Sequence, residues 1–472
     1  MQSDCWDALF LKGARIGYGH TLVRKVERNG RKLVETDALS HLQLTRFGQP
    51  VEQDLKLATL ETPEGQLLEF RTEVAMGPGP VVTTGHVDGD LLLIDIDDQG
   101  QRVRSAVPWS DSLRGFLGVE QSLAGQPLEP GQKRALRMLM PLLNDVADVE
   151  LAAGDYESTP VMGRPKKLLR IESVARLSDG NVMAETLWVD EQGEILKRRI
   201  AGLDQESHRT TEALAKAQAG ATAPTIDIGA DTIVPVAQPL AGAHQANELH
   251  YQVELAEGDP AKIFASGPTQ SVRSTGPHTA EITVRALSPA AAASSTPAAA
   301  RPDERYTAAN SVLQVADPEI QKMAAAARGA ETDPVKIALA LEKYVHDALS
   351  INDFTQAFSS AAEVAKSRTG DCTEHAVLLA ALARAAGIPS RVAIGLVYVE
   401  RAHGFGYHMW TEVYLNGQWV PLDATLGQGG IGAAHLKLVD SSLDGTTAYS
   451  AFLPVAQVVG QLQIKALDAP GK

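Results

Sequence analysis

The sequence predicts an α+β protein in which a β-rich, mostly antiparallel region is followed by a C-terminal domain of helices and strands. In the first third of the chain, apolar and polar residues alternate in runs separated by turn signals such as Asn29-Gly30 and Asp88-Gly89-Asp90. This pattern is typical of antiparallel sheets. After residue 300, helix starts at Asp317-Pro318 and Asp333-Pro334 precede a further helix and several strands. These observations predict a β-rich part and a separate α+β part.

Two low-complexity segments indicate how the 472 residues divide into domains. Residues 214–225 are rich in Ala, Gly and Thr, and residues 288–302 are rich in Ala and Pro. Both compositions are typical of linkers. We therefore expect a β-rich N-terminal domain with some helices over residues 1–213 and a C-terminal domain over residues 303–472. Residues 226–287 form either a small β module or an extension of the first domain.

Two helices are also expected inside the β-rich region. The first follows the capping signal Ser110-Asp111, where apolar residues recur at helical spacing as far as Leu123. The second is expected around residues 136–146, where apolar residues recur every three or four positions.

Charge and composition argue against some classes of partner. The chain has 58 acidic and 43 basic residues and a net charge of −15, whereas nucleic-acid binding depends on clustered Lys and Arg. No apolar run reaches the length of a membrane-spanning helix. We therefore expect no nucleic-acid partner and no integral membrane segment. The two cysteines, Cys5 and Cys372, are far apart in sequence and do not indicate a disulfide framework.

One of these cysteines lies at the predicted start of a helix. Cys372 follows Gly370 and Asp371, and an apolar run with helical spacing continues to Ala386. Unpaired backbone N–H groups and the positive end of the helix dipole favour a thiolate at such a position. Cys372 is therefore a candidate nucleophile, whereas Cys5 is interpreted as structural or incidental.

A candidate base and a candidate acid follow on a predicted hairpin. Two strands joined by a two-residue turn at Asn416-Gly417 are expected between Tyr407 and Asp423. This pairing places His408 opposite the chain just beyond Asp423. A bulge, or a kink at Pro421, would bring the two side chains together.

Three blocks in this region resemble the transglutaminase-like superfamily, in its bacterial type with a β-rich N-terminal accessory region. They are GDCTEHAVLLAALARAAGIPSRVAIGLVY with Cys372, YHMWTEVYLNGQWVPLD with His408, and LDATLG with Asp423. The resemblance implies a papain-like catalytic domain with a Cys-His-Asp triad, in which Asp423 holds the imidazole of His408 in the required tautomer. The sequence departs from the family at Ala424, where proline is usual, and this change is expected to loosen the turn beyond Asp423.

Other residues are expected near the triad. Tyr407 and Trp410 flank His408 in the family's motif, and His375 lies three residues after Cys372 on the same helix. Cys372, His375 and a later histidine are an alternative set of metal ligands, but no second cysteine or histidine pair at zinc-finger spacing accompanies them. We therefore predict no metal and no cofactor.

The oxyanion site is only partly indicated by the sequence. In a reaction of this kind, the backbone N–H of Cys372 donates to the oxyanion. Asn352 or Gln356 is a candidate for the second donor, and each is at least as readily interpreted as an ordinary polar loop residue. Glu374 is expected to be solvated or to pair with a basic residue.

The resemblance leaves the reaction open, because the superfamily contains cross-linking enzymes, peptidases, amidases and inactive members. We expect a cysteine peptidase or acyltransferase that acts on a peptide or isopeptide amide through a thioester, with hydrolysis preferred because water is the default acceptor. Transamidation of protein glutamine, which cross-links proteins, is one alternative, and a non-catalytic scaffold with a relic triad is another. The expected partner is a protein or peptide substrate, and the partner of the N-terminal region is not indicated.

Family members of this type are often exported, so a periplasmic or extracellular location is expected, with the cytoplasm as the alternative. The start from Met1 to Trp6 is polar and shows no signal peptide. A chain that begins after a removed signal has such a start.

Overall fold

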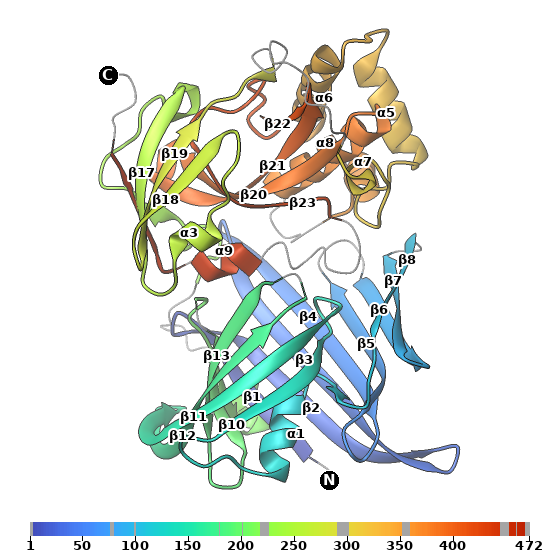
Figure 1. The fold of residues 1–472 in the computed structure, drawn as a ribbon, viewed down its shortest axis with the longest axis vertical. Helices are drawn as coiled ribbons and strands as arrows, with labels where there is room; N and C mark the ends of the chain where they lie inside the picture. The colour runs from blue at the N-terminus through green and yellow to red at the C-terminus, as the bar shows by residue number, and fades with distance from the viewer. Residues whose placement is uncertain are drawn as a thin grey trace. The chain divides into compact units, whose positions relative to one another are not determined.

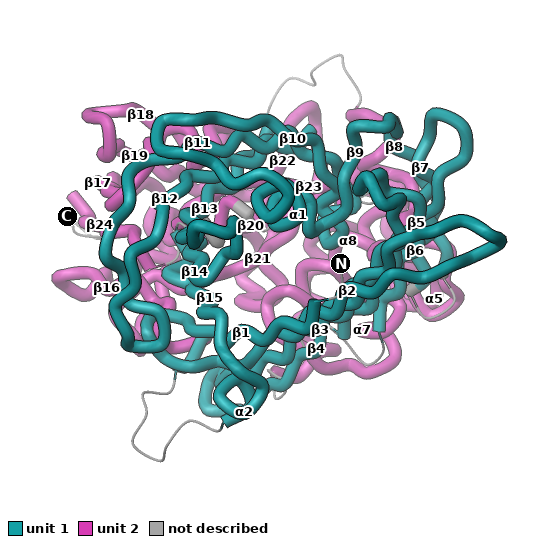
Figure 2. The backbone as a smooth tube through the Cα atoms, turned by 90° about the horizontal axis from the view of Figure 1, so that it is seen from below, with its two compact units in different colours: residues 1–228 teal, residues 229–472 magenta. Residues whose placement is uncertain are grey.

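The computed structural model forms two compact units, residues 1–228 and residues 229–472 (Figure 2). The predicted domain boundaries remain predictions, and the structural division falls between Ile228 and Gly229. The structure describes residues 3–75, 80–98, 101–178, 180–200, 202–217, 226–289, 302–351, 359–443, 453–458 and 460–467.

In the described part of the first unit, fifteen strands form one sheet (Figure 1). The strands are β1 (Ser3–Leu11), β2 (Ala14–Arg28), β3 (Arg31–Arg46), β4 (Gln49–Glu61), β5 (Leu67–Ala75), β6 (Pro80–Asp88), β7 (Leu91–Asp98), β8 (Gln101–Pro108), β9 (Leu113–Arg114), β10 (Lys133–Met140), β11 (Asp145–Val161), β12 (Arg164–Arg176), β13 (Val182–Val189), β14 (Ile195–Ile200) and β15 (Gln205–Thr210). Strands adjacent in sequence are adjacent in the sheet, except that β8 and β9 lie at its two ends. The pair of β1 with β15 joins the two halves. Apart from the parallel pair β9 and β10, the described strand pairs of this sheet are antiparallel. The predicted β-rich, mostly antiparallel region is therefore confirmed.

Tight turns set the register of the long hairpins, as the sequence indicates. Asn29 and Gly30 both have positive φ, 52° and 74°, and they join β2 to β3 with Arg28 opposite Arg31. Positive φ at both central residues is the requirement of a type I′ hairpin turn, which Asn-Gly satisfies at low steric cost.

One of the two helices expected in this unit is present, and the other prediction was wrong. Helix α1 (Gly118–Gly125) overlaps the end of the first predicted region, and the strands of the first unit curve around it in Figure 2. It begins after Leu117 and not at the expected Ser110-Asp111 cap, because Leu113 and Arg114 form β9. The second predicted region begins instead with β10, which pairs with β11 from Lys133 opposite Ala152 to Met140 opposite Asp145. Leu136 and Met140 suit a helical period, but they also suit a strand, and the long partner β11 supplies backbone hydrogen bonds that decide between the two.

In its described part, the second unit contains two smaller sheets. One has the order β16 (Val234–Pro235), β21 (Gly404–Leu415), β20 (Ser390–Val399) and β23 (His435–Ser441), with β22 (Gln418–Leu422) also paired to β21. The other has the order β18 (Gln270–Gly276), β19 (Thr279–Arg285), β17 (Glu248–Leu255) and β24 (Leu462–Ala466). The strands between residues 226 and 287 thus lie in the second unit.

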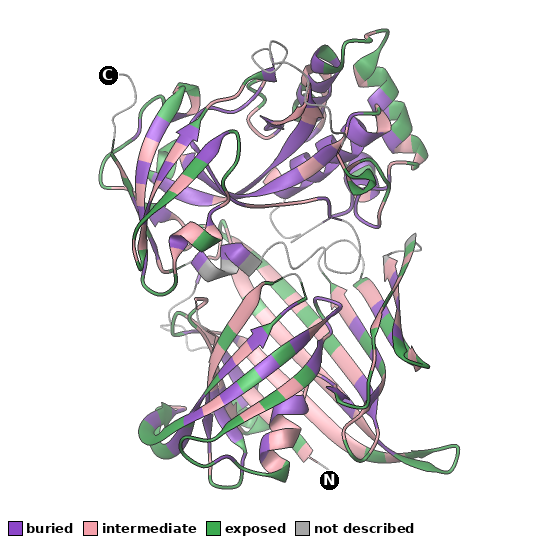
Figure 3. Cartoon of the chain, viewed as in Figure 1, coloured by how far each residue is buried: buried purple, intermediate pink, exposed green. Residues whose placement is uncertain are grey.

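Helix α8 (Cys372–Ala385) is the centre of the second unit. It contacts α5 (Pro318–Arg328), α6 (Pro334–Ala348) and α7 (Ala361–Ser367), and it also contacts β20 and β21. Figure 3 shows α8, β20 and β21 almost continuously buried, whereas many strand positions of the first unit are half-buried or exposed. The α+β fold class is therefore confirmed.

The remaining described helices are short. They are α2 (Glu212–Ala215), α3 (Pro260–Ile263), α9 (Leu453–Val458) and the 3₁₀ turns η1 (Ala243–Gln245), η2 (Glu304–Tyr306) and η3 (Glu400–Ala402). The expected caps of the longer helices are present, because the side chains of Asp317 and Asp333 accept backbone N–H bonds at the starts of α5 and α6. Within the described residues, no helix combines the length and the apolar character needed to cross a membrane.

Candidate active site

Cys372 is the first residue of α8 and is half-buried. The side chain of Asp371 caps the helix and accepts a 2.9 Å bond from the backbone N–H of Thr373. Gly370 precedes this cap with a φ of 156°, and a Cβ there would lie 2.2 Å from the Cβ of Glu374. The chain therefore passes close to Glu374 as it enters the helix.

Glu374 completes the cap from inside the helix, and the expectation that it is solvated or paired with a basic residue was wrong. Its side chain is 3% exposed and accepts bonds from the backbone N–H groups of Asp371 (3.0 Å) and Ser359 (3.2 Å). Burial, together with the nearby charge of Asp371, raises the pKa of Glu374 to about 8. Glu374 is buried here because it forms a reciprocal capping box with Asp371. In this box the two side chains accept hydrogen bonds from backbone N–H groups at the start of the helix.

His408 lies in the middle of β21, opposite Gly395 of β20, and is buried. Its Nε2 lies 2.7 Å from Oδ2 of Asp423, and Cys372 is near enough to its imidazole to raise the pKa of His408. Because Nε2 faces the carboxylate, Nδ1 is the ring nitrogen left for the sulfur. Burial by itself lowers the pKa of His408, but the Asp423 carboxylate and the Cys372 side chain outweigh it and raise the pKa to about 10.

Asp423 directly follows β22 and is fully buried. The hairpin has the predicted two-residue turn, with Leu415 opposite Gln418 and Thr411 opposite Leu422. The register runs without a shift, so the expected bulge is not needed: the chain leaves the sheet after Leu422 and turns Asp423 towards His408. Although burial opposes ionisation, His408 holds the pKa of Asp423 well below its usual value.

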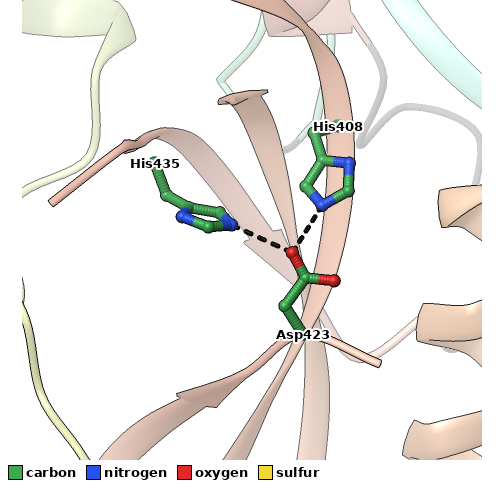
Figure 4. Close-up of side chains that lie close together, drawn as sticks. All are labelled: His408, Asp423 and His435. Carbon is green, nitrogen blue, oxygen red and sulfur yellow. Dashed lines mark hydrogen bonds and ion pairs between the residues drawn. The ribbon is translucent and has the colours of Figure 1, made fainter. Parts of the chain in front are cut away.

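A second histidine, which the sequence analysis missed, also bonds to Asp423. Nε2 of His435 lies 3.0 Å from the same oxygen, Oδ2, that bonds to His408, as Figure 4 shows. His435 begins β23, which pairs with β20 so that His435 lies opposite Val397 while His408 lies opposite Gly395. These two positions are two residues apart on one strand and therefore share a face. In the sequence, the only indication of this role was a histidine at the start of a predicted strand. The register of that strand against its neighbour could not be predicted across the intervening loop.

The family model of the transglutaminase-like superfamily matches residues 321–424. These residues belong to the transglutaminase-like superfamily. The match contains Cys372, His408 and Asp423, whereas His435 lies outside it.

Solved structures give only remote similarities to the chain. A candidate cysteine protease from Cytophaga hutchinsonii is 15% identical, with 46% of this chain and 83% of that chain covered and a TM-score of 0.30. A β-barrel-like protein from Brucella abortus is 11% identical, with 44% and 95% covered and a TM-score of 0.33. A candidate protease from Parabacteroides distasonis is 11% identical, with 81% and 69% covered and a TM-score of 0.21. Likenesses at these TM-scores carry no weight for fold or function. A search of the curated proteins found no match.

Helix α6 of the transglutaminase-like domain holds the turn beyond Asp423. Glu342 accepts bonds from the backbone N–H groups of Asp423 (3.2 Å) and Gly430 (3.3 Å), and His346 donates from Nδ1 to the carbonyl of Ala424 at 3.0 Å. Burial of the carboxyl raises the pKa of Glu342 to about 7. The expected loosening at Ala424 is therefore offset, since two side chains of α6 fix the turn that proline would otherwise restrain.

Of the residues expected near the triad, His375 and Trp410 are buried, and Tyr407 is half-buried. His375 donates from Nδ1 to the carbonyl of Asp371 at 2.7 Å, and burial lowers its pKa. Trp410 lies nearly parallel to His408, with ring centroids 6.2 Å apart, and meets His435 edge-on at 5.1 Å. The aromatic ring thus shields the imidazoles from water.

The two proposed oxyanion residues, Asn352 and Gln356, lie outside the described residues. The sequence offered Cys372, His375 and a later histidine as alternative metal ligands, but these are not the potential ligands that lie together among the described residues. Ligand atoms within 4.8 Å of one another belong instead to His408, Asp423 and His435. In this cluster both imidazoles already bond to the carboxylate, so hydrogen bonding accounts for the arrangement.

Proposed function

We propose that the transglutaminase-like domain is a cysteine-dependent hydrolase of peptide or isopeptide amides. The observation that supports this proposal is that the His408 imidazole bonds to the Asp423 carboxylate and lies near enough to Cys372 for that side chain to raise its pKa. A half-buried thiol at a helix N-terminus, beside a histidine that favours its protonated form, is the arrangement of an activated nucleophile.

The first half-reaction follows from this ion pair. The Cys372 thiolate attacks the carbonyl carbon of the amide, and the backbone N–H of Cys372 donates to the oxygen that becomes negatively charged. When the C–N bond breaks, His408 gives its proton to the leaving amine. The acyl group is then bound to Cys372 as a thioester, and His408 is neutral.

The second half-reaction needs the neutral imidazole. His408 removes a proton from water, the hydroxide oxygen attacks the thioester carbonyl, and the C–S bond breaks to release a carboxylic acid and restore the ion pair. Asp423 stays ionised throughout and stabilises the imidazolium when it forms. The high pKa of His408 supports a resting ion pair at neutral pH.

The proposal predicts that Cys372→Ala abolishes amide hydrolysis and leaves the fold unchanged. The measurement is amine release from a library of peptides and isopeptides, with circular dichroism as a check on folding. Cys5→Ala is the matched control, because Cys5 is the second free cysteine and lies in the other unit. Activity that survives in Cys372→Ala would disprove the assigned nucleophile.

The same library run with a primary amine separates hydrolysis from transamidation. Mass spectrometry should find a free carboxylic acid as the main product even when a millimolar alkylamine is present. An amide adduct as the main product would show that the thioester transfers its acyl group to amines, and transamidation would then replace hydrolysis as the proposed reaction.

A further inference from the structure

We propose that His435 is a positioning residue of this site, a neutral imidazole that holds the Asp423 carboxylate in place without competing for its charge. The inference rests on the proposed function, because it concerns the ion pair between Cys372 and His408.

Each carboxylate oxygen of Asp423 accepts two hydrogen bonds. Oδ1 accepts from the backbone N–H groups of Thr425 (2.9 Å) and Leu426 (3.3 Å), while Oδ2 accepts from His408 and His435 (Figure 4). The two backbone bonds fix one oxygen, and His435 helps to fix the oxygen that bonds to His408. The carboxylate therefore cannot rotate away from His408 without breaking a bond to His435.

The burial of the cluster favours a neutral form of His435. Asp423, His408 and His435 are 0%, 5% and 2% exposed, and the carboxylate is already paired with His408, so a second imidazolium would be a further charge buried away from water. The described titratable groups that act on His435 are Asp423, His408 and His244, whose ring centroid lies 6.1 Å away. Burial lowers the pKa of His435, and the attraction of Asp423 only partly offsets it.

The hydrogen bonds of His435 also define its tautomer. Nε2 points at the carboxylate and must carry the proton, so Nδ1 bears the lone pair, and this atom has no partner among the described residues. A neutral Nε2–H donor stabilises the carboxylate without adding a charge. The full countercharge of Asp423 therefore remains available to the His408 imidazolium.

The fold places His435 through a specific feature of the sheet. The pairing of β20 with β23 shifts register between Ile394 and Gly395, which is a bulge next to the site. Gly395 permits the approach, because a Cβ there would lie 2.1 Å from the carbonyl oxygen of Leu436. Strand β23, which carries His435, is thus brought close to β20, the strand that lies between β23 and the His408 strand β21.

The test compares His435→Phe, which keeps a ring but has no donor, with His435→Gln, which keeps an N–H donor. The rate of Cys372 alkylation by iodoacetamide is measured against pH in the full chain. We expect the inflection of His435→Phe to rise by about one pH unit, which corresponds to about a tenfold change in thiolate population at a fixed pH. His435→Gln should rise less. The control is His250→Phe, because His250 lies on β17, in the other sheet of the second unit, and its side chain is 42% exposed.

The outcomes separate this inference from the proposed function. An ordinary thiol inflection near ~8.5 in the unmodified protein would disprove the proposed function itself. A low inflection in that protein that is unchanged in folded His435→Phe would overturn the role of His435 alone. A merely structural role would lower thermal stability and leave the inflection unchanged, so it counts as the second outcome.

A second measurement keeps the inference testable if His435→Phe does not fold. Nitrogen-15 NMR of the imidazoles in the unmodified protein at pH 7 reports charge and tautomer, and the spectrum of His435→Gln identifies the signals of His435. A neutral ring protonated at Nε2 is expected. A charged His435, or one protonated only at Nδ1, would overturn the inference.

Discussion

At the scale of single residues, the charge of Asp423 determines the protonation of its neighbours. It is fully buried, it accepts from two backbone N–H groups and two imidazoles, and it is the anion that raises the pKa of His408. Without that anion, burial alone would favour neutral His408. The activation proposed for Cys372 therefore depends on a residue that acts through His408.

Asp423→Asn should remove the ion pair while keeping the shape of the site. An amide supplies one acceptor for two imidazoles and no negative charge, so the pKa of His408 falls and the thiol inflection returns towards ~8.5. By analogy with the orienting aspartate of triads, turnover should fall by roughly 10⁴. Alkylation against pH and amide hydrolysis measure the two effects.

The matched control for this prediction is Asp347→Asn. Asp347 is exposed on α6 and pairs with Lys343, so its loss should leave both measurements unchanged. A low inflection that persists in Asp423→Asn would show that the helix N-terminus alone activates the thiol.

Single residues also show which parts of the site the sequence can predict. Cys372, His408 and Asp423 lie in contiguous motifs whose neighbours define a helix start and a hairpin, so local pattern and family resemblance suffice to select them. Glu342 and His435 act through α6 packing and through the register of β23. Neither position carries a local signal, because each depends on how segments distant in sequence are brought together.

At the scale of elements, the start of α8 is the most constrained turn of the site. Gly370→Ala places a Cβ 2.2 Å from the Cβ of Glu374 in a backbone conformation that favours glycine, φ 156°. We expect a loss of roughly 1–3 kcal/mol in the free energy of unfolding. Cys372 alkylation at neutral pH should also slow down, since the cap that places the thiol must shift. Urea unfolding and the alkylation rate measure these changes.

Gly267→Ala serves as the control, because a Cβ at Gly267 would meet no atom within 4 Å and this residue lies in the same unit. Equal free energies of unfolding for the two variants would contradict the prediction, because the new Cβ would then fit beside Glu374 without loss of stability.

Helix α6 should make the stability of the second unit depend on pH through Glu342. Its pKa of about 7 in the folded protein lies above the ordinary value of 4.5. The stabilisation is therefore fully present below about pH 4.5, and it is lost as the pH rises through about 7, because the buried carboxyl must then ionise. At about 1.4 kcal/mol per pKa unit, the loss is roughly 3 kcal/mol.

Glu342→Gln should remove this dependence, because an amide oxygen can still accept the backbone bonds and does not ionise. Relative to the unmodified protein, its free energy of unfolding should match near pH 5 and be higher near pH 8. Urea unfolding at the two pH values is the measurement, and Glu254→Gln, exposed on β17, is the control. A constant difference between variant and unmodified protein at both pH values would contradict the prediction.

Helices and hairpins whose ends are marked by capping or turn residues were predictable from the sequence. Segments whose spacing suits both a helix and a strand were not. The caps at Asp317 and Asp333 and the Asn416-Gly417 turn specify local geometry by their own chemistry, and the structure contains them. The second helix expected around residues 136–146 was wrong, because β10 takes its hydrogen bonds from β11. Local spacing cannot report such a partner.

At the scale of the whole molecule, the sequence indicated a β-rich first part but not its single continuous sheet. The joining pair is β1 with β15, which places Trp6 opposite Thr210. A pairing across some two hundred residues leaves no local trace in either strand. By contrast, the residues assigned to the site fall within about a hundred positions of one another, so their order along the chain was informative.

The residues assigned to the site, and the helices and strands that position them, lie within residues 229–472. We therefore predict that this segment, produced alone, retains the low alkylation inflection of Cys372 that the proposed function predicts for the full chain. The same segment with Cys372→Ala is the control for labelling elsewhere, and circular dichroism verifies folding. The thiol should be activated because the dipole of α8 and the pair of His408 with Asp423 are internal to the segment. A folded segment whose Cys372 titrates as an ordinary thiol would show instead that activation of the nucleophile requires the β-rich unit.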